Sequence, residues 1–363
     1  MKIDFANLQY QYQLYKDDID EAIHAVLDKS NYIMGEEVSK LEENLQKFTG
    51  AKYAITCSSG TDALLLAMMA LGIKPDDEII TTPFTFIATA ETISFLGAKP
   101  VFVDIDEESY NIDASKIKNV ITNKTKAIMP VSLYGQCADM DAINEIAKEF
   151  DIPVIEDACQ SFGATYNDKK SCNLSTIGCT SFFPSKPLGA YGDGGAVFTD
   201  DDEIATKIRM LLNHGQNERY KHKYIGINGR LDAVQAAVLN VKLKHFDKEV
   251  KLRDEIGERY SDLLEEANVI TPKIHESNKS VYAQYSIRVE DRESMVEKLT
   301  ALEIPTAVHY PVPLHLQEAF KDLGYSEGDF PISEKISSQI MSLPMSPYLT
   351  EAEQDFIVQA IKG

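Results

Sequence analysis

Short apolar runs and helical apolar spacing alternate along the first two-thirds of the chain. Runs of strand length occur at residues 53–57, 78–82, 100–103, 126–132 and 152–156. Between them, apolar residues recur every three or four positions, which is the spacing of a helix with one buried face. A repeated strand–helix order predicts a mostly parallel sheet that helices cover on both faces. We therefore predict an α/β fold for this part of the chain.

The same spacing predicts where the helices lie and where the pattern changes. The predicted helices span residues 17–29, 37–48, 62–71, 83–96, 113–121, 139–150, 201–212 and 234–267. From about Asn268 the pattern is sparser, with one alternating strand at 280–289 and one helix at 292–302. This is typical of a smaller α+β domain. We predict a large domain over residues 1–245, which begins with an N-terminal arm, and a small C-terminal domain over residues 246–363.

Length and charge narrow the class of protein. A chain of 363 residues is long enough for two domains with hydrophobic cores of their own. The formal net charge of -21 argues against nucleic acid as a partner, because binding to phosphates needs a basic face. It also means that an anionic substrate must be held by a few well-placed basic or hydroxyl groups.

Membrane and metal signals are not found in the sequence. The first residues carry no charged region followed by an apolar run, and no later segment is long and apolar enough to cross a bilayer. The five cysteines are an odd number without C-x-x-C spacing, which favours free thiols in a reducing compartment. The seven histidines form no metal-binding motif. We expect a cytoplasmic protein without a metal site and without a membrane partner.

One lysine, Lys186, stands among prolines and glycines instead of on a charged helix face. Pro184 and Pro187 flank it and prevent a regular helix, and the apolar residues at 182–183 and 196–198 predict buried strands on either side. Apolar walls disfavour the charged form of an amine, as a lysine nucleophile requires at neutral pH. The stretch is thus compatible with a lysine that forms a Schiff base with a cofactor aldehyde. Taken alone, it favours the plainer interpretation of a glycine-rich hairpin with an incidental lysine.

A candidate phosphate site lies at residues 58–61, Ser-Ser-Gly-Thr, between a predicted strand and a predicted helix. The N-terminus of a helix offers free backbone N–H groups and a favourable dipole to a phosphate. Ser58 or Thr61 can equally be a plain helix cap. The stretch matches neither a Walker A loop nor a G-x-G-x-x-G fingerprint, which argues against an ATPase or a Rossmann oxidoreductase.

Two polar residues, Asp157 and Gln160, follow the predicted strand at 152–156. Ligands of parallel sheets collect at the carboxyl ends of the strands. A carboxylate in this place can face the ring nitrogen of a cofactor and keep it protonated. Gln160 would reach the same side if the turn is helical. The alternative for Asp157 is a helix N-cap.

Taken together and in this order, these stretches resemble the DegT/DnrJ/EryC1/StrS sugar aminotransferases. The resemblance rests on Ser58–Thr61, 82–89, Asp157, Gln160, Lys186 and Gly192–Gly195, and it covers essentially the whole chain. It implies the aspartate-aminotransferase-like fold, fold type I of the pyridoxal-phosphate enzymes, with the cofactor in the large domain. Further stretches are most similar to the subgroup of UDP-2-acetamido-2-deoxy-ribo-hex-3-uluronate aminotransferases: 130–139, 181–189, 280–285 and 305–311.

The resemblance also implies roles for individual residues. Lys186 would form the Schiff base with pyridoxal 5'-phosphate and move protons during catalysis, and Asp157 would pair with the pyridinium nitrogen. The other implied cofactor contacts are Ser59, Gly60, Thr61, Phe86, Gln160, Ser181 and, from the second subunit of a homodimer with shared active sites, Asn228. Phe86 can instead be a core aromatic. The candidates for binding the nucleotide sugar are Arg230, His309 and Tyr310, because an acidic protein needs such donors for an anionic substrate.

The implied reaction is a transamination. L-glutamate would give its amino group and leave as 2-oxoglutarate, and a UDP-linked 2-acetamido-3-keto glucuronic acid would receive the amino group for bacterial surface polysaccharide. The family also contains dehydratases with a histidine at the lysine position, so Lys186 favours transamination. Two alternatives remain, namely amination of UDP-2-acetamido-3-keto-glucose for lipid A and a non-catalytic regulator that binds the cofactor.

Overall fold

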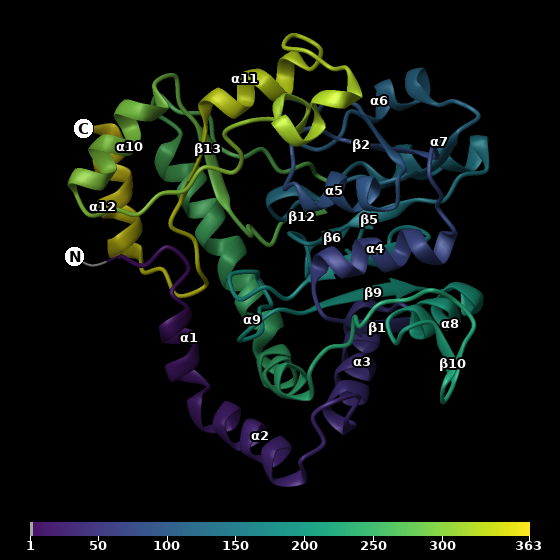
Figure 1. Ribbon diagram of the computed structural model, residues 1–363. Coiled ribbons are helices and arrows are strands. Elements are labelled where there is room, and N and C mark those ends of the chain that lie inside the picture. Colours follow the sequence, from purple (N-terminus) through teal and green to yellow (C-terminus); the bar gives the residue numbers. More distant parts are fainter. Residues whose placement is uncertain (1–2) are drawn as a thin grey trace.

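The central feature of the fold is a sheet with helices on both sides (Figure 1). The computed structural model describes residues 3–363. A three-stranded sheet, β3–β2–β4, and a four-stranded sheet, β5–β8–β9–β1, are joined through isolated bridges between residues 128 and 154 and between residues 131 and 157. The bounds are β1 (Tyr53–Cys57), β2 (Glu78–Thr81), β3 (Lys99–Phe102), β4 (Thr125–Ile128), β5 (Ile155–Asp157), β8 (Ile177–Ser181) and β9 (Gly195–Thr199).

Most neighbouring strands of this sheet are parallel, as the strand–helix order predicts. β9 is the exception, since it runs antiparallel to both β8 and β1. Residues 182–194 connect β8 to β9 without a helix, the usual crossover between parallel strands, and the two strands pair as an antiparallel hairpin. Lys186 lies in this link. The sheet therefore holds the lysine loop at both ends, with Ser181 paired to Gly195.

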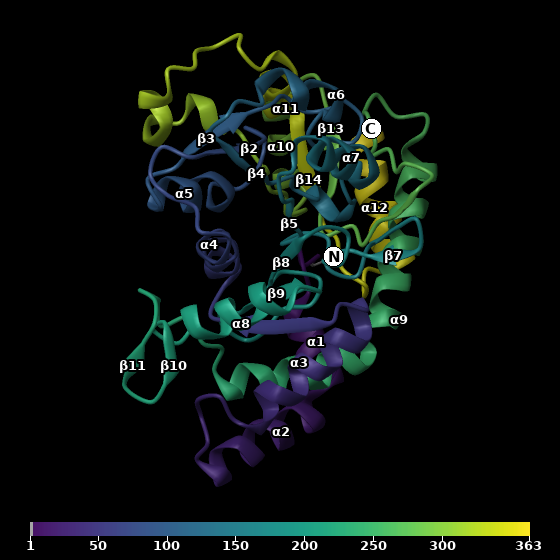
Figure 2. The ribbon, with the colours of Figure 1, turned by 90° about the vertical axis from the view of Figure 1, so that its right-hand side faces the viewer.

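Helices cover the sheet on both faces, as two views of the ribbon show (Figures 1 and 2). The bounds of those in the first two-thirds of the chain are α1 (Leu8–Leu14), α2 (Lys16–Lys29), α3 (Glu36–Thr49), α4 (Gly60–Leu71), α5 (Ala88–Phe95), α6 (Ala114–Ile117), α7 (Met140–Phe150), α8 (Asp202–Leu211) and α9 (Ala233–Leu264). Alternate strand residues face opposite layers. Val197 of β9 packs in the core with α4 and α8, whereas its neighbours Ala196 and Phe198 pack with α3 and α9.

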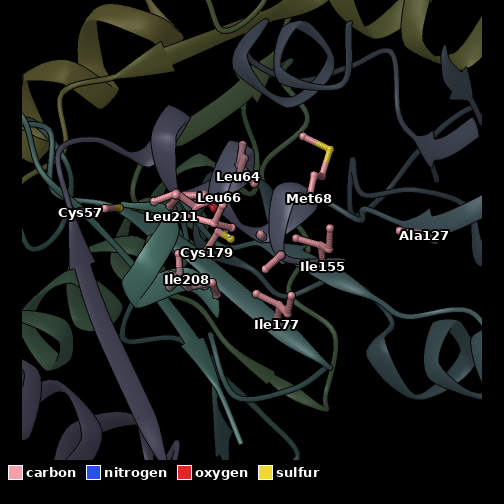
Figure 3. Packing of buried hydrophobic residues seen from close by; sticks show 14 of the residues in the cluster. Cys57, Leu64, Leu66, Met68, Ala127, Ile155, Ile177, Cys179, Ile208 and Leu211 are labelled. Carbon is pink, nitrogen blue, oxygen red and sulfur yellow. Dashed lines mark hydrogen bonds between the residues drawn. The ribbon is translucent and has the colours of Figure 1, made fainter. Parts of the chain in front are cut away.

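The helix α4 is buried on several sides. Its residues Leu64, Leu66 and Met68 pack with strand residues such as Ile177 and with Ile208 of α8 (Figure 3). A helix that is apolar all round is stable only inside a core. Because α4 is held in this way, its N-terminus has a defined position at the end of β1.

The last third of the chain forms a core of its own. β13 (Tyr285–Arg288) pairs antiparallel with β14 (Ile340–Leu343). This part of the chain also contains the short strand β12 (Asn278–Lys279) and the helices α10 (Arg292–Ala301), α11 (Pro331–Gln339) and α12 (Glu351–Lys362). Earlier in the chain lie the short strands β6 (Thr165–Tyr166) and β7 (Lys169–Lys170) and the hairpin β10–β11 (Gln216–Glu218 and Lys221–His222). α9 contributes to both cores, with Phe246 in the first and Tyr260 in the second. We retain the division into residues 1–245 and 246–363 as a proposal, with α9 running across it.

Two sequence predictions were wrong near the lysine loop and the fifth helix. The strand before Lys186 ends at Ser181, and Phe183 is half exposed instead of buried. The helix predicted at 83–96 begins only at Ala88. Residues 83–87 form a bend instead, and this segment packs against the C-terminal region, where Leu314 N donates to the Pro83 carbonyl.

Within residues 3–363, no helix combines the length and the apolar composition that crossing a bilayer requires.

Candidate active site

A cavity of about 440 Å³ opens where the parallel strands of the sheet end. Parallel sheets place their ligands at this edge, and the volume suits a small organic ligand. The cavity brings together most of the sequence-predicted site residues, namely Ser59, Gly60, Thr61, Phe86, Asp157, Gln160, Ser181, Lys186, His309 and Tyr310.

Two predicted residues, Asn228 and Arg230, do not line this cavity. They lie beside Asn213, just after α8. Asn228 forms an antiparallel bridge with Asn213, and Arg230 Nη1 donates to Asn213 Oδ1 at 2.7 Å. A single copy of the chain therefore does not bring them to the cavity.

The loop that carries Lys186 is closed by backbone hydrogen bonds. Lys186 N donates to the Phe183 carbonyl at 2.8 Å, and Ala190 N donates to the Phe182 carbonyl at 2.7 Å. The Lys186 amine has no hydrogen bond or ion pair with any residue of the described chain. Burial lowers the pKa of this amine, and the nearby Cys159 and Asp157 oppose that effect only in part. The amine is thus set up as a nucleophile or a base.

Asp157, the last residue of β5, is a buried carboxylate without a cation. Its oxygens accept hydrogen bonds from Thr89 Oγ1 at 2.7 Å and from Cys159 N at 3.2 Å. No lysine, arginine or histidine of residues 3–363 forms an ion pair with it. The alternative of a helix N-cap does not apply, because no helix follows β5 directly. A buried negative charge of this kind suits a cationic ligand atom.

Gln160 bridges two parts of the cavity wall. Its Oε1 accepts from Tyr134 N at 3.1 Å, and its Nε2 donates to the Tyr310 hydroxyl at 3.2 Å. Burial, together with the charge of Asp157, raises the pKa of Tyr310, so its hydroxyl stays protonated at neutral pH. Phe86 lies at the rim, 53% exposed, with its ring centroid 6.1 Å from that of Tyr310. Phe86 is therefore not a core aromatic.

The N-terminus of α4 also lines the cavity. Ser59 is the N-cap and accepts from Asp62 N, so neither Ser58 nor Thr61 is the cap. The turn has no room for side chains, because a Cβ on Gly60 would lie 2.6 Å from Ser181 Cβ, and one on Gly195 would lie 2.4 Å from the Ser59 carbonyl oxygen. The first N–H groups of a helix lack intrahelical partners and attract anions.

These features fit pyridoxal phosphate. The α4 N-terminus suits the phosphate, the buried carboxylate of Asp157 suits a protonated pyridine nitrogen, and the unpaired Lys186 amine suits an aldehyde. A metal is not needed for this fit. Within residues 3–363, no cluster of three or more His, Cys, Asp or Glu side chains is arranged to hold a metal ion.

One residue behind the site gave no signal in the sequence. Lys242 lies on the helix α9 among other charged residues and looks like part of a solvated face. In the structure its side chain is buried, and its Nζ donates to the Gly189 carbonyl, three residues after Lys186. The amine also lies 5.2 Å from the centroid of the Tyr191 ring. Lys242 therefore ties the rear of the lysine loop to α9.

The burial of Lys242 leads us to expect that the free energy of unfolding depends on pH. Burial lowers the pKa of Lys242 from 10.5 to about 8, so between these pH values the unfolded chain binds the extra proton. The contribution of Lys242 to the free energy of unfolding should therefore rise with pH through this window, by up to roughly 3 kcal/mol. This contribution is measured by urea unfolding of the wild type and of Lys242→Met from pH 7 to pH 10. Lys244→Met, which replaces an exposed lysine, is the control. Parallel stability curves for wild type and Lys242→Met would rule the prediction out.

Comparison with known proteins places the chain among aminotransferases. The model of the DegT/DnrJ/EryC1/StrS aminotransferase family matches residues 13–362. The chain is 54% identical, over 99% of both chains, to the UDP-2-acetamido-2-deoxy-3-oxo-D-glucuronate aminotransferase of Pseudomonas aeruginosa. It is 46% identical to a pleiotropic regulatory protein of Geobacillus stearothermophilus, over 99% of this chain and 98% of that protein. It is also 38% identical, over 99% and 97%, to the UDP-N-acetyl-3-dehydro-alpha-D-glucosamine 3-aminotransferase of Acidithiobacillus ferrooxidans.

Solved structures agree with this match over the whole length. DesV of S. venezuelae superposes with a TM-score of 0.98 at 36% identity, covering 99% of this chain and 98% of that one. NtdA of Bacillus subtilis, solved with the bound cofactor PMP, superposes with a TM-score of 0.92 at 32% identity, covering 99% and 84%.

Proposed function

The chain belongs to the DegT/DnrJ/EryC1/StrS aminotransferase family, which depends on pyridoxal phosphate, and from this premise we propose its reaction. The chain transfers the amino group of L-glutamate to C3 of a UDP-linked 2-acetamido-3-keto glucuronic acid and releases 2-oxoglutarate. The observation that carries the proposal is the 54% identity, over 99% of both chains, to an aminotransferase named for this sugar. The free amine of Lys186 in the cavity supports it.

The residues of the cavity divide into three tasks. Ser59, Gly60, Thr61 and Ser181 would bind the cofactor phosphate at the α4 N-terminus, Asp157 would keep the pyridine nitrogen protonated, and Gln160 and Phe86 would contact the ring. When bound, pyridoxal phosphate supplies an electron sink for the carbon that loses a proton.

Lys186 moves the protons. Its Nζ would carry a proton from Cα of the amino donor to the cofactor in one half of the reaction and from the cofactor to C3 of the sugar in the other. The lowered pKa of the amine favours the neutral form that a base requires.

We propose a homodimer as the active unit, in which Asn228 and Arg230 reach the cavity of the partner subunit. Support comes from the adjoining hairpin β10–β11, which projects from the body of the molecule in both views (Figures 1 and 2). Tyr220 and Ile225 on this segment are 79% and 91% exposed. Apolar side chains so exposed are typical of a surface that a second subunit covers.

The proposed compartment is the cytoplasm, and the proposed product is a 3-amino sugar for O-antigen and related lipopolysaccharide. The five cysteines are all free, which suits a reducing environment.

The main alternative is the neutral sugar, UDP-2-acetamido-3-keto-glucose, as the lipid A route would require. The 38% identity to the 3-aminotransferase of Acidithiobacillus ferrooxidans favours it less strongly than the 54% match favours the uronic acid. A non-catalytic regulator is the second alternative, since a regulatory protein is 46% identical. The intact set of Lys186, Asp157 and Gln160 in one cavity argues for catalysis.

An assay with two sugars that differ only at C6 tests the proposed substrate. We expect kcat/KM to be roughly 10- to 100-fold higher for the uronic acid, because a charged hydrogen bond to the C6 carboxylate contributes that much. Formation of 2-oxoglutarate from L-glutamate gives the rate, and omission of the sugar is the control. A preference for the neutral sugar would favour the lipid A alternative, and no turnover with either sugar, despite a bound cofactor, would favour the regulator.

A further inference from the structure

The loop between β8 and β9 is bound by the side chains of two α9 residues, Gln235 and Lys242. Seven positions separate them, so both lie on the same face of the helix, two turns apart. Lys242 Nζ donates to the Gly189 carbonyl oxygen. Gln235 Oε1 accepts from Tyr191 N at 2.9 Å, and Gln235 Nε2 donates to the Tyr191 carbonyl oxygen at 3.2 Å. Three hydrogen bonds thus join α9 to the loop.

The chemistry of the groups fixes the direction of each of these bonds. A backbone N–H can only donate, so the oxygen of the Gln235 amide faces Tyr191 N and its NH2 group faces the Tyr191 carbonyl. The two ends of the amide therefore match both backbone groups of one residue and hold it in a single position. Gly192 fits this arrangement, since a Cβ there would lie 2.8 Å from Gln235 Nε2.

The segment that α9 holds contacts the turn that contains Lys186. A Cβ on Gly189 would lie 2.4 Å from the Pro184 carbonyl oxygen, so the two backbones touch. Ala190 N donates at 2.7 Å to the Phe182 carbonyl, at the start of the loop. A displacement of the segment held by α9 would therefore displace the backbone of Lys186 as well.

The burial of Lys242 is unfavourable for a contact that serves stability alone. The side chain is 2% exposed, yet within residues 3–363 its amine has one hydrogen bond, to the loop, and no ion pair. Removal of an ammonium group from water is costly, and an apolar side chain of similar size is often at least as stable in such a place. Proteins tolerate local costs of this kind mainly at functional sites. The position of Lys242 behind the lysine loop therefore indicates a role in function.

We propose that Gln235 and Lys242 are positioning residues that hold the Lys186 amine in place through the backbone of the loop. Groups on loops are held less accurately than groups on helices or strands, and a displacement of about 1 Å can lower a rate roughly 100-fold. The two side chains fix the loop to α9, which is itself held by packing in both cores. The expected loss of rate rests on the proposed function, whereas the rigidity of the loop does not.

Lys242→Met tests the proposal by separating activity from stability. Methionine is apolar and similar in length, so at neutral pH we expect the melting temperature to equal or exceed that of the wild type. We expect the rate to fall roughly 10-fold in the half-reaction with L-glutamate and in the half-reaction with the keto sugar, because Lys186 moves the proton in both. The KM for each substrate should stay within about twofold. A loss of rate in only one half-reaction, or in neither, would overturn the proposal.

Gln235→Met removes the other two hydrogen bonds without removing a charge. We expect the same pattern with a smaller loss of rate, roughly 3- to 10-fold. The matched controls are Lys244→Met and Gln359→Met, which make the same substitutions at exposed positions of α9 and α12. Both controls should keep the wild-type rates. A melting temperature of Lys242→Met that falls together with its rate would indicate a structural role and contradict the proposal.

Hydrogen exchange measures the mobility of the loop without any substrate. In the full-length holoenzyme, the amides of Lys186 and Ala190 are bonded to carbonyls within the loop. We expect these amides to exchange roughly 10-fold faster in Lys242→Met and Gln235→Met, while exchange in β5 and α4 keeps the wild-type rates. Unchanged exchange in the loop, or faster exchange throughout the protein, would contradict the proposal. Absence of turnover in the wild-type protein would count against the proposed function alone, since the exchange result does not depend on substrate.

Discussion

Lys186→Ala is expected to reduce turnover by about 10⁴-fold or more, because it removes both the covalent link to the cofactor and the group that moves the protons. The Lys186 amine is the one amine that the loop between β8 and β9 presents to the cavity. No lysine of the described chain other than Lys186 lines that cavity, so no neighbour can take its place. The measurement is 2-oxoglutarate formation in the presence of the keto sugar.

Mass spectrometry of the same variant measures whether the cofactor is covalently attached. After borohydride reduction, the wild-type chain should carry one cofactor, and Lys186→Ala should carry none. The exposed Lys244→Ala serves as control and should retain both turnover and the adduct. The role of Lys186 would be refuted by an adduct on another residue of the variant or by turnover within tenfold of wild type.

Asp157→Asn is expected to lower kcat by roughly 10²- to 10³-fold while the protein keeps its fold. The amide has the size of the carboxylate, its one oxygen can still accept from Cys159 N, and its NH2 group can donate to Thr89 Oγ1 in place of the bond that the carboxylate accepts. It carries no negative charge, so the ring nitrogen of the cofactor loses the partner that keeps it protonated. A thermal melt and a steady-state assay on the same preparation separate folding from catalysis.

The matched control for this change is Asp151→Asn. Asp151 is exposed at the end of α7 with a φ of 54°, a left-handed conformation that asparagine adopts readily. We expect this variant to keep full activity and stability. Unchanged kcat in Asp157→Asn would remove Asp157 from the mechanism, and joint loss of activity and of the folded state would assign it a structural role.

Apolar patterning located the strands of the central sheet and most helices around it, although β4 ends four residues before its predicted end and β5 begins three residues after its predicted start. β1 matches its predicted range, and β2 and β3 lie within one residue of theirs. The helix at 83–96 and the strand at 182–183 were wrong, because their apolar residues contact other parts of the chain or the cavity. Phe86 and Phe183 are about half exposed at the cavity, so their apolar character reflects a binding surface instead of a core.

The candidate site was predicted as a set of residues but not as an arrangement. Gly60, Asp157 and Lys186 follow strand ends, and parallel strand ends meet at one edge, so their proximity follows from the pattern. The resemblance added His309 and Tyr310, which come from the last third of the chain. The position of Asn228 outside the cavity was implied through the expected second subunit, whereas that of Arg230, predicted beside His309 and Tyr310, was not expected.

Residue identity and spacing along the chain were sufficient for the fold class, the family and the reactive amine, because each of these depends on short stretches in a conserved order of elements. The contacts that hold the residues of the site in place arise from packing between distant parts of the chain. Lys242 reaches Gly189 across 53 positions, and Tyr134 reaches the His309 carbonyl across 175. No local pattern encodes such pairs, since a buried lysine has the same sequence signature as an exposed one. They become visible only once α9 lies against the lysine loop and β13 pairs with β14.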